Sequence, residues 1–242
     1  MRNTKKIQRP LYQMMDNTAL KKKNNLIEIL YEDDNYIVFN KPAGLLVIPT
    51  PQKEKRTLDS IVNEQYVDPK STSKLHPCHR LDRETSGVIV FAKGKAAQKL
   101  MMDIFKQREI KKKYIAFVRG VLKNDNGEIK RAVNDLDQRK FNKNSTAKLA
   151  ITRYKVIERR DKFTVVDVEL VTGRTNQIRI HFSQIGYPLI GERKYAKGSE
   201  STVKFKRVAL HASSLECINP ITKKKIVVRT EIPQDMQKIM NV

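Results

Sequence analysis

One short polar segment holds the residues of this chain that are best suited to chemistry. Residues 79–87 read His-Arg-Leu-Asp-Arg-Glu-Thr-Ser-Gly and run directly into the apolar stretch 88–92. Arg80 and Arg83 flank Asp82, and their positive charges favour its ionised form. An ionised carboxylate beside a strand suits a nucleophile or an electrostatic stabiliser better than a general acid. An Asp–Arg pair that only fixes a loop would produce the same pattern, so these residues alone leave both interpretations open.

A second segment combines a tight turn, a helix start and two arginines. Residues 172–181 read Thr-Gly-Arg-Thr-Asn-Gln-Ile-Arg-Ile-His. Gly173 permits the turn, and the free N–H groups at the start of the following helix carry a partial positive charge. Arg174 and Arg179 add full charges there. The segment is suited to bind a phosphate or a carboxylate, although a basic helix with one buried face would have the same sequence.

The sequence predicts neither a metal site nor a cofactor. His76, Cys78 and His79 lie close together, but three ligands within four residues cannot readily surround one tetrahedral ion. No glycine-rich phosphate loop of the nucleotide-binding types is present. The chain opens with no signal peptide and has no apolar run long enough for a bilayer. We therefore expect a cytoplasmic protein whose two cysteines are reduced thiols.

The charge of the chain points to an anionic partner. Its 242 residues include 49 Lys and Arg against 26 Asp and Glu, which gives a net charge of +23. Nucleic acid is the leading candidate, because its phosphates present dense negative charge. An acidic membrane surface is less favoured, since no amphipathic basic helix with Trp or Phe anchors is apparent. A lysine-rich proteome would also raise the charge.

The order of predicted elements indicates an α+β fold on a largely antiparallel sheet. Residues 1–25 carry seven Lys or Arg and one acidic residue, which predicts a basic, partly disordered N-terminal arm before a domain over 26–242. Alternating or β-rich runs predict strands at 27–31, 36–40, 45–48, 87–92, 114–118, around 147–151, and at 165–170, 205–211, 213–218 and 224–231. In the strand around 147–151, the odd-numbered apolar side chains lie on one face. Helices are predicted from a Thr57 cap to Tyr66, over 96–108 and over about 175–184.

Taken in order, these motifs resemble the RluA-type family of RNA pseudouridine synthases. The resemblance extends from about Leu26 to Met236 and implies the pseudouridine synthase fold, with helices flanking the sheet and a central active-site cleft. It also implies that the partner is RNA, namely ribosomal and/or transfer RNA in which specific uridines are isomerised to pseudouridine. The resemblance implies no cofactor and no metal. Its parts are residues 29–34, 40–45, 79–82, 85–87, 112–114, 173–179, 186–195, 210–212 and 233–236.

The resemblance assigns roles to five residues. Asp82 matches the family's catalytic aspartate, which attacks or deprotonates the nucleoside in the first step. Tyr114 matches the pocket tyrosine that stacks on the base and helps remove the C5 proton. Arg179 matches the basic residue that pairs with the aspartate and holds it ionised. Arg80 matches a residue that fills the space left by a flipped uridine, and Arg174 is an expected RNA contact.

The chain also departs from the family pattern at three positions. Asn176 and Tyr187 stand where the family commonly has His, and Glu192 stands where it commonly has Asp. We expect none of the three to contact the proposed catalytic residues. The resemblance is to the short branch without an S4-type RNA-binding module, and a monomer is expected. The alternative is a non-catalytic RNA-binding or ribosome-assembly factor on the same fold.

Overall fold

The computed structural model describes residues 26–133, 147–196 and 203–240 of the protein, so the predicted N-terminal arm over 1–25 lies outside the described residues. The elements, in order, are β1 (Ile29–Glu32), β2 (Tyr36–Lys41), α1 (Leu58–Tyr66), β3 (Leu75–Pro77), β4 (Ser86–Lys93), α2 (Lys95–Gln107), β5 (Lys111–Arg119), β6 (Asn126–Val133), β7 (Lys148–Arg159), β8 (Phe163–Leu170), α4 (Gln177–Gln184), β9 (Leu210–Ile218), β10 (Lys225–Arg229) and α5 (Gln234–Met240).

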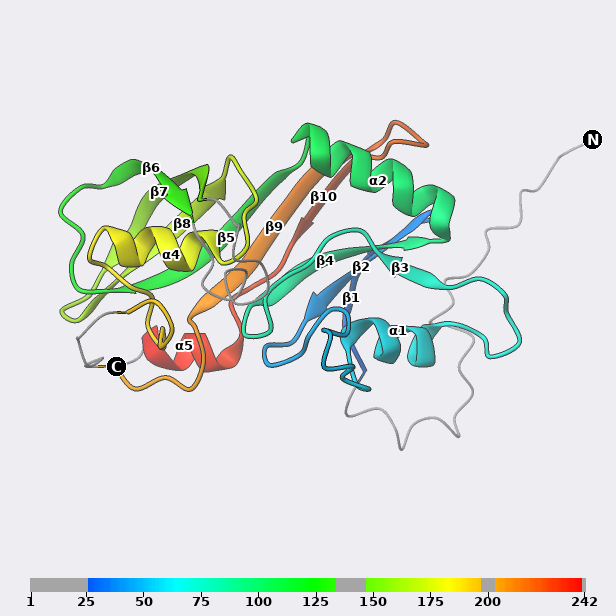
Figure 1. The fold of residues 1–242 in the computed structure, drawn as a ribbon, viewed down its shortest axis with the longest axis horizontal. Coiled ribbons are helices and arrows are strands. Elements are labelled where there is room, and N and C mark those ends of the chain that lie inside the picture. The colour runs from blue at the N-terminus through cyan, green and yellow to red at the C-terminus, as the bar shows by residue number, and fades with distance from the viewer. Residues whose placement is uncertain (1–25, 134–146, 197–202, 241–242) are drawn as a thin grey trace, which may run out of the picture.

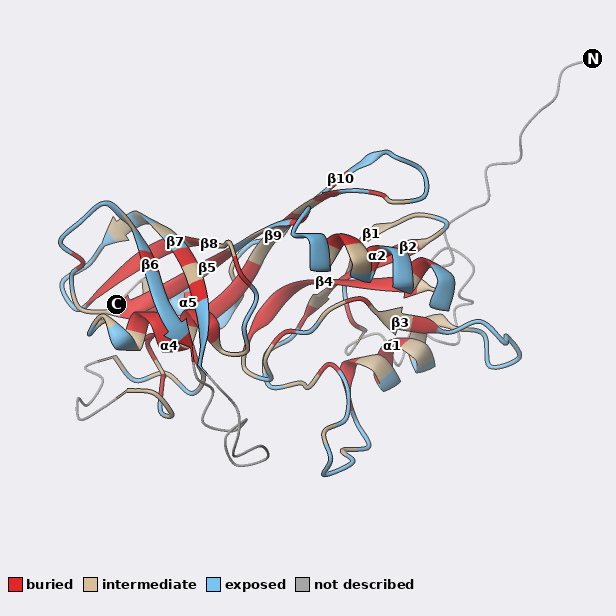
Figure 2. Ribbon diagram, turned by 45° about the horizontal axis from the view of Figure 1, so that its top comes forward, coloured by how far each residue is buried: buried red, intermediate tan, exposed pale blue. Residues whose placement is uncertain are grey.

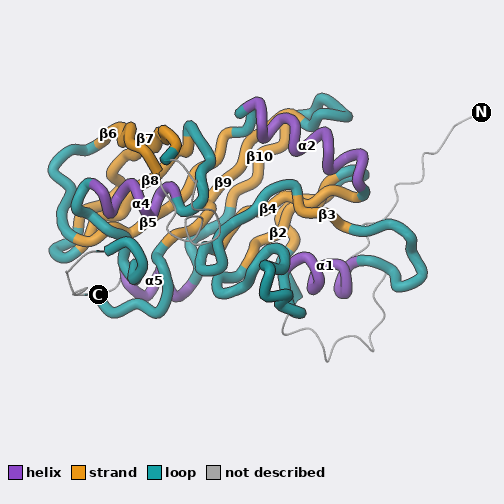
Figure 3. Tube along the Cα trace, in the orientation of Figure 1, coloured by secondary structure: helices purple, strands orange, loops and turns teal. Residues whose placement is uncertain are grey.

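A ten-stranded, mainly antiparallel sheet runs through the whole molecule (Figure 1 and Figure 3). Its main path is β1-β2-β4-β9-β5-β8-β7-β6, with β10 beside β9 and β3 beside β4. Among the described strands only β4 and β9 pair in parallel. The predicted α+β class with a largely antiparallel sheet is therefore confirmed.

Helices cover both faces of the sheet, and the burial of alternate strand residues shows which helix covers which face. On β2, Ile37 and Phe39 belong to an apolar cluster that includes α1, whereas Tyr36 and Val38 belong to one that includes α2. Neighbouring strand residues point to opposite faces, so α1 and α2 lie on opposite sides of β2. Helix α4 joins the same cluster as α1. Buried residues follow the strands of the sheet in Figure 2.

The helix predictions that rest on local signals are confirmed. Thr57 caps α1 with a capping box, in which its side chain accepts from Ser60 N and the Ser60 hydroxyl accepts from Thr57 N. Helix α2 buries Ala97, Met101 and Ile104 at helical spacing, as its sequence indicates. Its C-cap residue, Arg108, adopts the left-handed conformation that commonly ends a helix.

The strand prediction over 45–48 is wrong, because this segment bonds to a helix and not to a strand. Leu46 O accepts from Leu58 N at 2.7 Å, and Val47 O accepts from Asp59 N at 3.0 Å. Residues 45–48 thus supply acceptors to two of the free N–H groups at the start of α1. Strands β3 and β6 and helix α5 were not among the predicted elements.

Two further strand predictions are corrected. The predicted pair 205–211 and 213–218 is one strand, β9, which begins at Leu210 and has an irregularity opposite Lys113 and Tyr114. In β7 the face with the odd-numbered apolar side chains is not the buried one, since Leu149 is 56% exposed while Ala150 is buried. Ala150 packs with Ile180 of α4, so the covering helix decides which side of β7 is buried.

The parallel contact between β4 and β9 joins the two halves of the sheet. Gly87 of β4 pairs with Ala212 of β9, and Ala212 in turn pairs with Tyr114 of β5. Gly87 has φ of +110°, and a Cβ at this position would lie 2.2 Å from Ala212 O. Only glycine allows both the backbone conformation and the approach. The motif of residues 79–87 thus ends two strands away from Tyr114.

Replacement of Gly87 by alanine should destabilise the protein more than the same change at Gly94. Both glycines have a positive φ near 110°, but a Cβ at Gly94 would meet no atom within 4 Å. Gly94→Ala should therefore cost only backbone strain, on the order of 1–3 kcal/mol. Gly87→Ala should cost about 1–3 kcal/mol more from the contact with Ala212. Urea unfolding measures both, and equal losses would contradict the steric account.

Candidate active site

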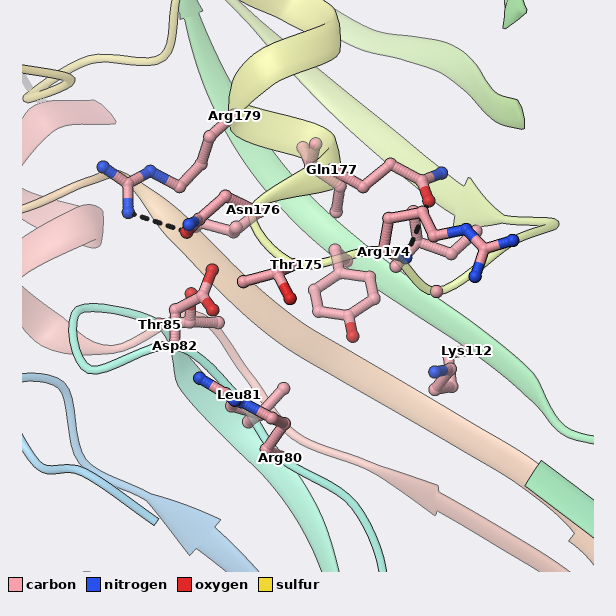
Figure 4. Close-up of a pocket in the computed structure, with 15 residues that line it drawn as sticks. Arg80, Leu81, Asp82, Thr85, Lys112, Arg174, Thr175, Asn176, Gln177 and Arg179 are labelled. Carbon is pink, nitrogen blue, oxygen red and sulfur yellow. Dashed lines mark hydrogen bonds between the residues drawn. The ribbon is translucent and has the colours of Figure 1, made fainter. Parts of the chain in front are cut away.

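A pocket between the two halves of the sheet brings the two sequence motifs together (Figure 4). The loop before β4 supplies Asp82, β5 supplies Tyr114, and the first turn of α4 supplies Arg179. All five residues singled out in the sequence line this pocket. Within the described residues, the lining consists of Arg80, Leu81, Asp82, Thr85, Lys112, Tyr114, Leu170, Gly173, Arg174, Thr175, Asn176, Gln177, Ile178, Arg179 and Leu210.

The loop that carries Asp82 is tied down by both halves of the molecule. Gly44 N donates to Arg83 O at 2.8 Å, and Arg207 donates to Glu84 O at 3.1 Å. The Glu84 carboxylate accepts from Val208 N at 3.0 Å. The two residues that follow Asp82 are thus held through their backbone, which fixes the position of the carboxylate before any ligand binds.

A buried lysine adds to this support. Lys41 at the end of β2 is fully buried, and its ammonium donates to Pro42 O, Leu45 O and Arg83 O. Burial lowers the pKa of Lys41 to about 7, and the charge of Asp82 opposes this shift. The residues that follow Lys41 form a turn at Ala43 and Gly44. In the structure, the side chain of Lys41 also links that turn to the Asp82 loop.

Tyr114 is buried on β5 in the same pocket. Burial raises the pKa of its hydroxyl above the ordinary value, and the negative charge of Asp82 raises it further. The phenol is therefore protonated at neutral pH. The effect of Asp82 on the pKa of Tyr114 indicates that the carboxylate and the ring lie in one electrostatic environment.

Gln177 holds the turn that carries Arg174, a task that the sequence did not reveal. Its carbonyl oxygen accepts from the Thr172 hydroxyl at 2.7 Å and from Arg174 N at 3.0 Å. Its amide nitrogen donates to Ile151 O and to the Thr152 hydroxyl, both on β7. The backbone N–H of Arg174, just before the helix, is thus occupied by Gln177. The side chain of Arg174 remains exposed at the pocket.

His79 is a structural residue at the base of the Asp82 loop. Its Nε2 accepts from Val90 N at 3.1 Å, and its ring lies 4.5 Å from that of Phe105. Burial lowers the pKa of His79 to about 3, so the ring is neutral at physiological pH. The described residues contain no group of three or more His, Cys, Asp or Glu that could hold a metal ion. Every helix in the described ranges is too short or too polar to cross a membrane.

Sequence comparisons identify the family of this chain. The model of the family described as RNA pseudouridylate synthase matches residues 35–184. A Bacillus subtilis protein named "Uncharacterized RNA pseudouridine synthase YhcT" is 32% identical over 217 residues, which cover 88% of this chain and 71% of that protein. The chain belongs to the RNA pseudouridylate synthase family. It is therefore an isomerase that converts uridine to pseudouridine in RNA.

Further comparisons of this pseudouridine synthase agree with the family and the fold. A Xylella fastidiosa protein named ribosomal large subunit pseudouridine synthase D is 31% identical, covering 88% of this chain and 68% of that protein. The solved structure of human RNA pseudouridylate synthase domain containing 4 matches with a TM-score of 0.75 at 23% identity, over 93% of this chain and 94% of that one. The expected pseudouridine synthase fold is thus confirmed.

Two of the three departures from the family pattern contact Arg179, which corrects the expectation that none would. Glu192 accepts two hydrogen bonds from the Arg179 guanidinium, at 2.7 and 2.9 Å, and Asn176 accepts a third at 3.1 Å (Figure 4 shows the Asn176 bond). Of the three residues, Asn176 is in the described pocket lining, and Tyr187 and Glu192 are not. Separation in sequence hid the contact with Glu192, which reaches Arg179 across the turn after α4, whereas Asn176 is a close neighbour of Arg179 in the sequence.

The Arg179–Glu192 pair is almost completely buried. The Glu192 side chain is 0% exposed and that of Arg179 is 12% exposed. Burial opposes both charges, but the mutual hydrogen bonds outweigh it, so the pKa of Arg179 is raised and that of Glu192 is lowered. The charges of Asp82 and Glu84 raise the pKa of Arg179 further. Asp82 thus affects Arg179 through its charge. The hydrogen bonds that the Arg179 guanidinium donates go to Glu192, at 2.7 and 2.9 Å, and to Asn176, at 3.1 Å.

Replacement of Glu192 by glutamine should destabilise the protein at neutral pH. The change leaves the Arg179 charge buried without its counter-ion, at a cost of about 3 kcal/mol. Because the folded-state pKa of Glu192 is lowered, the pair stabilises the protein above the ordinary carboxylate pKa and loses this effect as pH falls through the lowered value. The difference between wild type and Glu192→Gln should therefore shrink in acid.

Urea unfolding at pH 7 and at about pH 3 tests this prediction. Glu128→Gln is a suitable control, because Glu128 pairs with Arg153 at the surface, where both side chains are largely exposed. This control should cost less than about 1 kcal/mol at either pH. A loss for Glu192→Gln that did not depend on pH would contradict the proposed electrostatic origin.

Proposed function

We propose that this pseudouridine synthase uses Asp82 as its catalytic carboxylate on a uridine of ribosomal and/or transfer RNA. The observation that carries the proposal is the position of Asp82, on a loop held from both sides, in a pocket shared with Tyr114 and Arg179. The reaction breaks the N1–C1′ bond and joins C5 of the same base to C1′. The proton lost at C5 is balanced by one gained at N1, so no oxidant or cofactor is required.

Each of the three proposed catalytic residues has a role that its environment supports. Asp82 attacks or deprotonates the nucleoside to begin the detachment of the base. Arg179 stabilises the ionised form of Asp82 electrostatically from its position on Glu192. Tyr114 stacks on the detached base, and its hydroxyl takes part in moving the C5 proton. Because that hydroxyl is protonated, it can receive the C5 proton only when it passes its own proton to an acceptor.

The proposed RNA contacts lie at the mouth of the pocket. A uridine in folded RNA must leave its stack to reach Asp82, which requires base flipping. Arg80 is exposed on the Asp82 loop, where its planar guanidinium could occupy the space that the uridine leaves. Arg174 is exposed on the opposite side of the pocket and is proposed to contact the backbone.

The class of RNA is proposed from the relatives and from the chemistry. Several relatives are named for the large ribosomal subunit, which favours ribosomal RNA as a substrate. We further propose that residues 26–242 act as one catalytic domain, that a monomer suffices because one chain brings all five proposed site residues into the pocket, and that the protein works in the cytoplasm. The basic segment 1–25 is proposed to add contacts with phosphates.

Asp82→Asn should abolish pseudouridine formation while RNA binding and stability remain close to wild type. The amide is nearly isosteric with the carboxylate but is a poor nucleophile and a poor base, so the rate should fall at least about 10³-fold. The effect is measured as the pseudouridine that each protein forms when it is added to total RNA from cells that lack the gene. Asp161→Asn, the same change in an exposed turn between β7 and β8, should leave the rate unchanged.

The possible results separate the two functional hypotheses. Substantial activity in Asp82→Asn would exclude the proposed role of the carboxylate. An inactive wild-type chain that still binds RNA would favour the non-catalytic RNA-binding or ribosome-assembly factor.

Tyr114→Phe should lower the rate about 10²-fold or more and leave RNA affinity nearly unchanged. The substitution keeps the ring that stacks on the base but removes the hydroxyl that takes part in proton transfer. Single-turnover kinetics measures the rate, and Tyr187→Phe is the control because Tyr187 does not line the pocket. Wild-type kinetics in Tyr114→Phe would limit the role of Tyr114 to packing.

A further inference from the structure

The pocket contains one lysine to which no part of the proposed mechanism assigns a task. Lys112 lies on β5 two residues before Tyr114, so both side chains point to the same face of the sheet. Both line the pocket, whereas the intervening Lys113 points to the other face and pairs with Asp167 at 2.6 Å. The geometry of β5 thus separates two adjacent lysines into a pocket residue and a surface residue.

Lys112 is partly buried without an anionic partner. Its ammonium lies 5.2 Å from the centre of the Phe105 ring, and within the described residues it makes no hydrogen bond and no ion pair. Burial lowers the pKa of Lys112, with no opposing contribution from a carboxylate. A partly buried cation that lacks a counter-ion reduces stability. Its presence in a pocket is therefore consistent with a ligand that supplies the missing negative charge.

The surroundings of Lys112 define which charge the ligand should carry. In Figure 4, Lys112 and Arg174 lie at the opposite end of the pocket from Asp82 and Arg179. Arg174 and Arg80 are exposed cations of the same lining, and Asp82 is the one carboxylate among its described residues. Gly173 leaves space beside the ammonium, since a Cβ there would come within 3.9 Å of Lys112 Nζ. This end of the pocket is therefore a cationic recess with room beside the nitrogen.

We propose that Lys112 binds a phosphodiester group of the RNA next to the uridine that enters the pocket. The proposal rests on the proposed function, because RNA is the substrate that places a phosphate within reach of a base held at Asp82. Lysine acts on phosphate as a compact point charge and does not require the planar geometry of arginine. Lys112 is thus a binding residue for the RNA backbone, and it anchors the nucleotide while Asp82 acts on the sugar–base bond.

The test compares Lys112→Met with Lys113→Met in binding a twelve-nucleotide oligouridylate between 50 and 200 mM salt. Both variants lose one positive charge from the same strand, so a general effect of net charge is equal in the two. Lys112→Met should weaken binding about tenfold and reduce the slope of log affinity against log salt by about 0.7, the value of one phosphate contact on a single strand. Lys113→Met should change both quantities much less.

A second measurement distinguishes binding from folding. Lys112→Met removes a partly buried cation that has no counter-ion, so its melting temperature should equal or exceed that of the wild type. Lys112→Arg keeps the charge and should recover part of the affinity. A lower melting temperature for Lys112→Met, or affinity and salt slope equal to those of Lys113→Met, would overturn the proposal.

Pseudouridine formation by the wild-type chain in total RNA separates failure of this inference from failure of the proposed function. An active wild type with equal binding by the two lysine variants rejects the phosphate contact alone. An inactive wild type rejects the proposed function, and the binding role of Lys112 beside a reacting uridine fails with it.

Discussion

The close backbone contact between Gly87 and Ala212 is the constraint on which the site depends. It lets β4 run parallel to β9, and β9 in turn pairs with β5, so one row of the sheet contains Gly87, Ala212 and Tyr114. Neighbouring strands lie about 4.8 Å apart, which places the end of the Asp82 loop about 10 Å from the backbone of Tyr114. A larger residue at Gly87 would separate the strands and, with them, the two halves of the pocket.

Charges inside the site are balanced by different means. The Arg179 charge is balanced by Glu192, and the Lys41 ammonium is held by three carbonyl oxygens that also fix the Asp82 loop. Lys112 has neither kind of partner within the described residues and is proposed to find it in the RNA. The paired charges thus organise the free protein, whereas the proposed role of Lys112 is realised only when substrate binds.

The sequence correctly predicted those structural features that depend only on residues close together in the chain. The Thr57 cap and the apolar face of α2 are local signals, and both are confirmed. The alternation in β7 did not show which side is buried, because that side is set by α4, which packs there only in the folded chain.

The same difference applies to the site. Asp82, Tyr114 and Arg179 were found because they lie in recognisable motifs, and the structure brings them into one pocket. The partner of Arg179 was missed because Glu192 approaches it through tertiary structure. The burial of Lys41 was missed because a lysine at the end of a strand looks the same in sequence whether it is exposed or enclosed.

The most direct test of the account is pseudouridine mapping of total RNA from cells with and without this gene. The account predicts at least one uridine in ribosomal or transfer RNA whose modification disappears with the gene and returns when the wild-type gene is restored. An unchanged set of pseudouridines in all cellular RNA would contradict it.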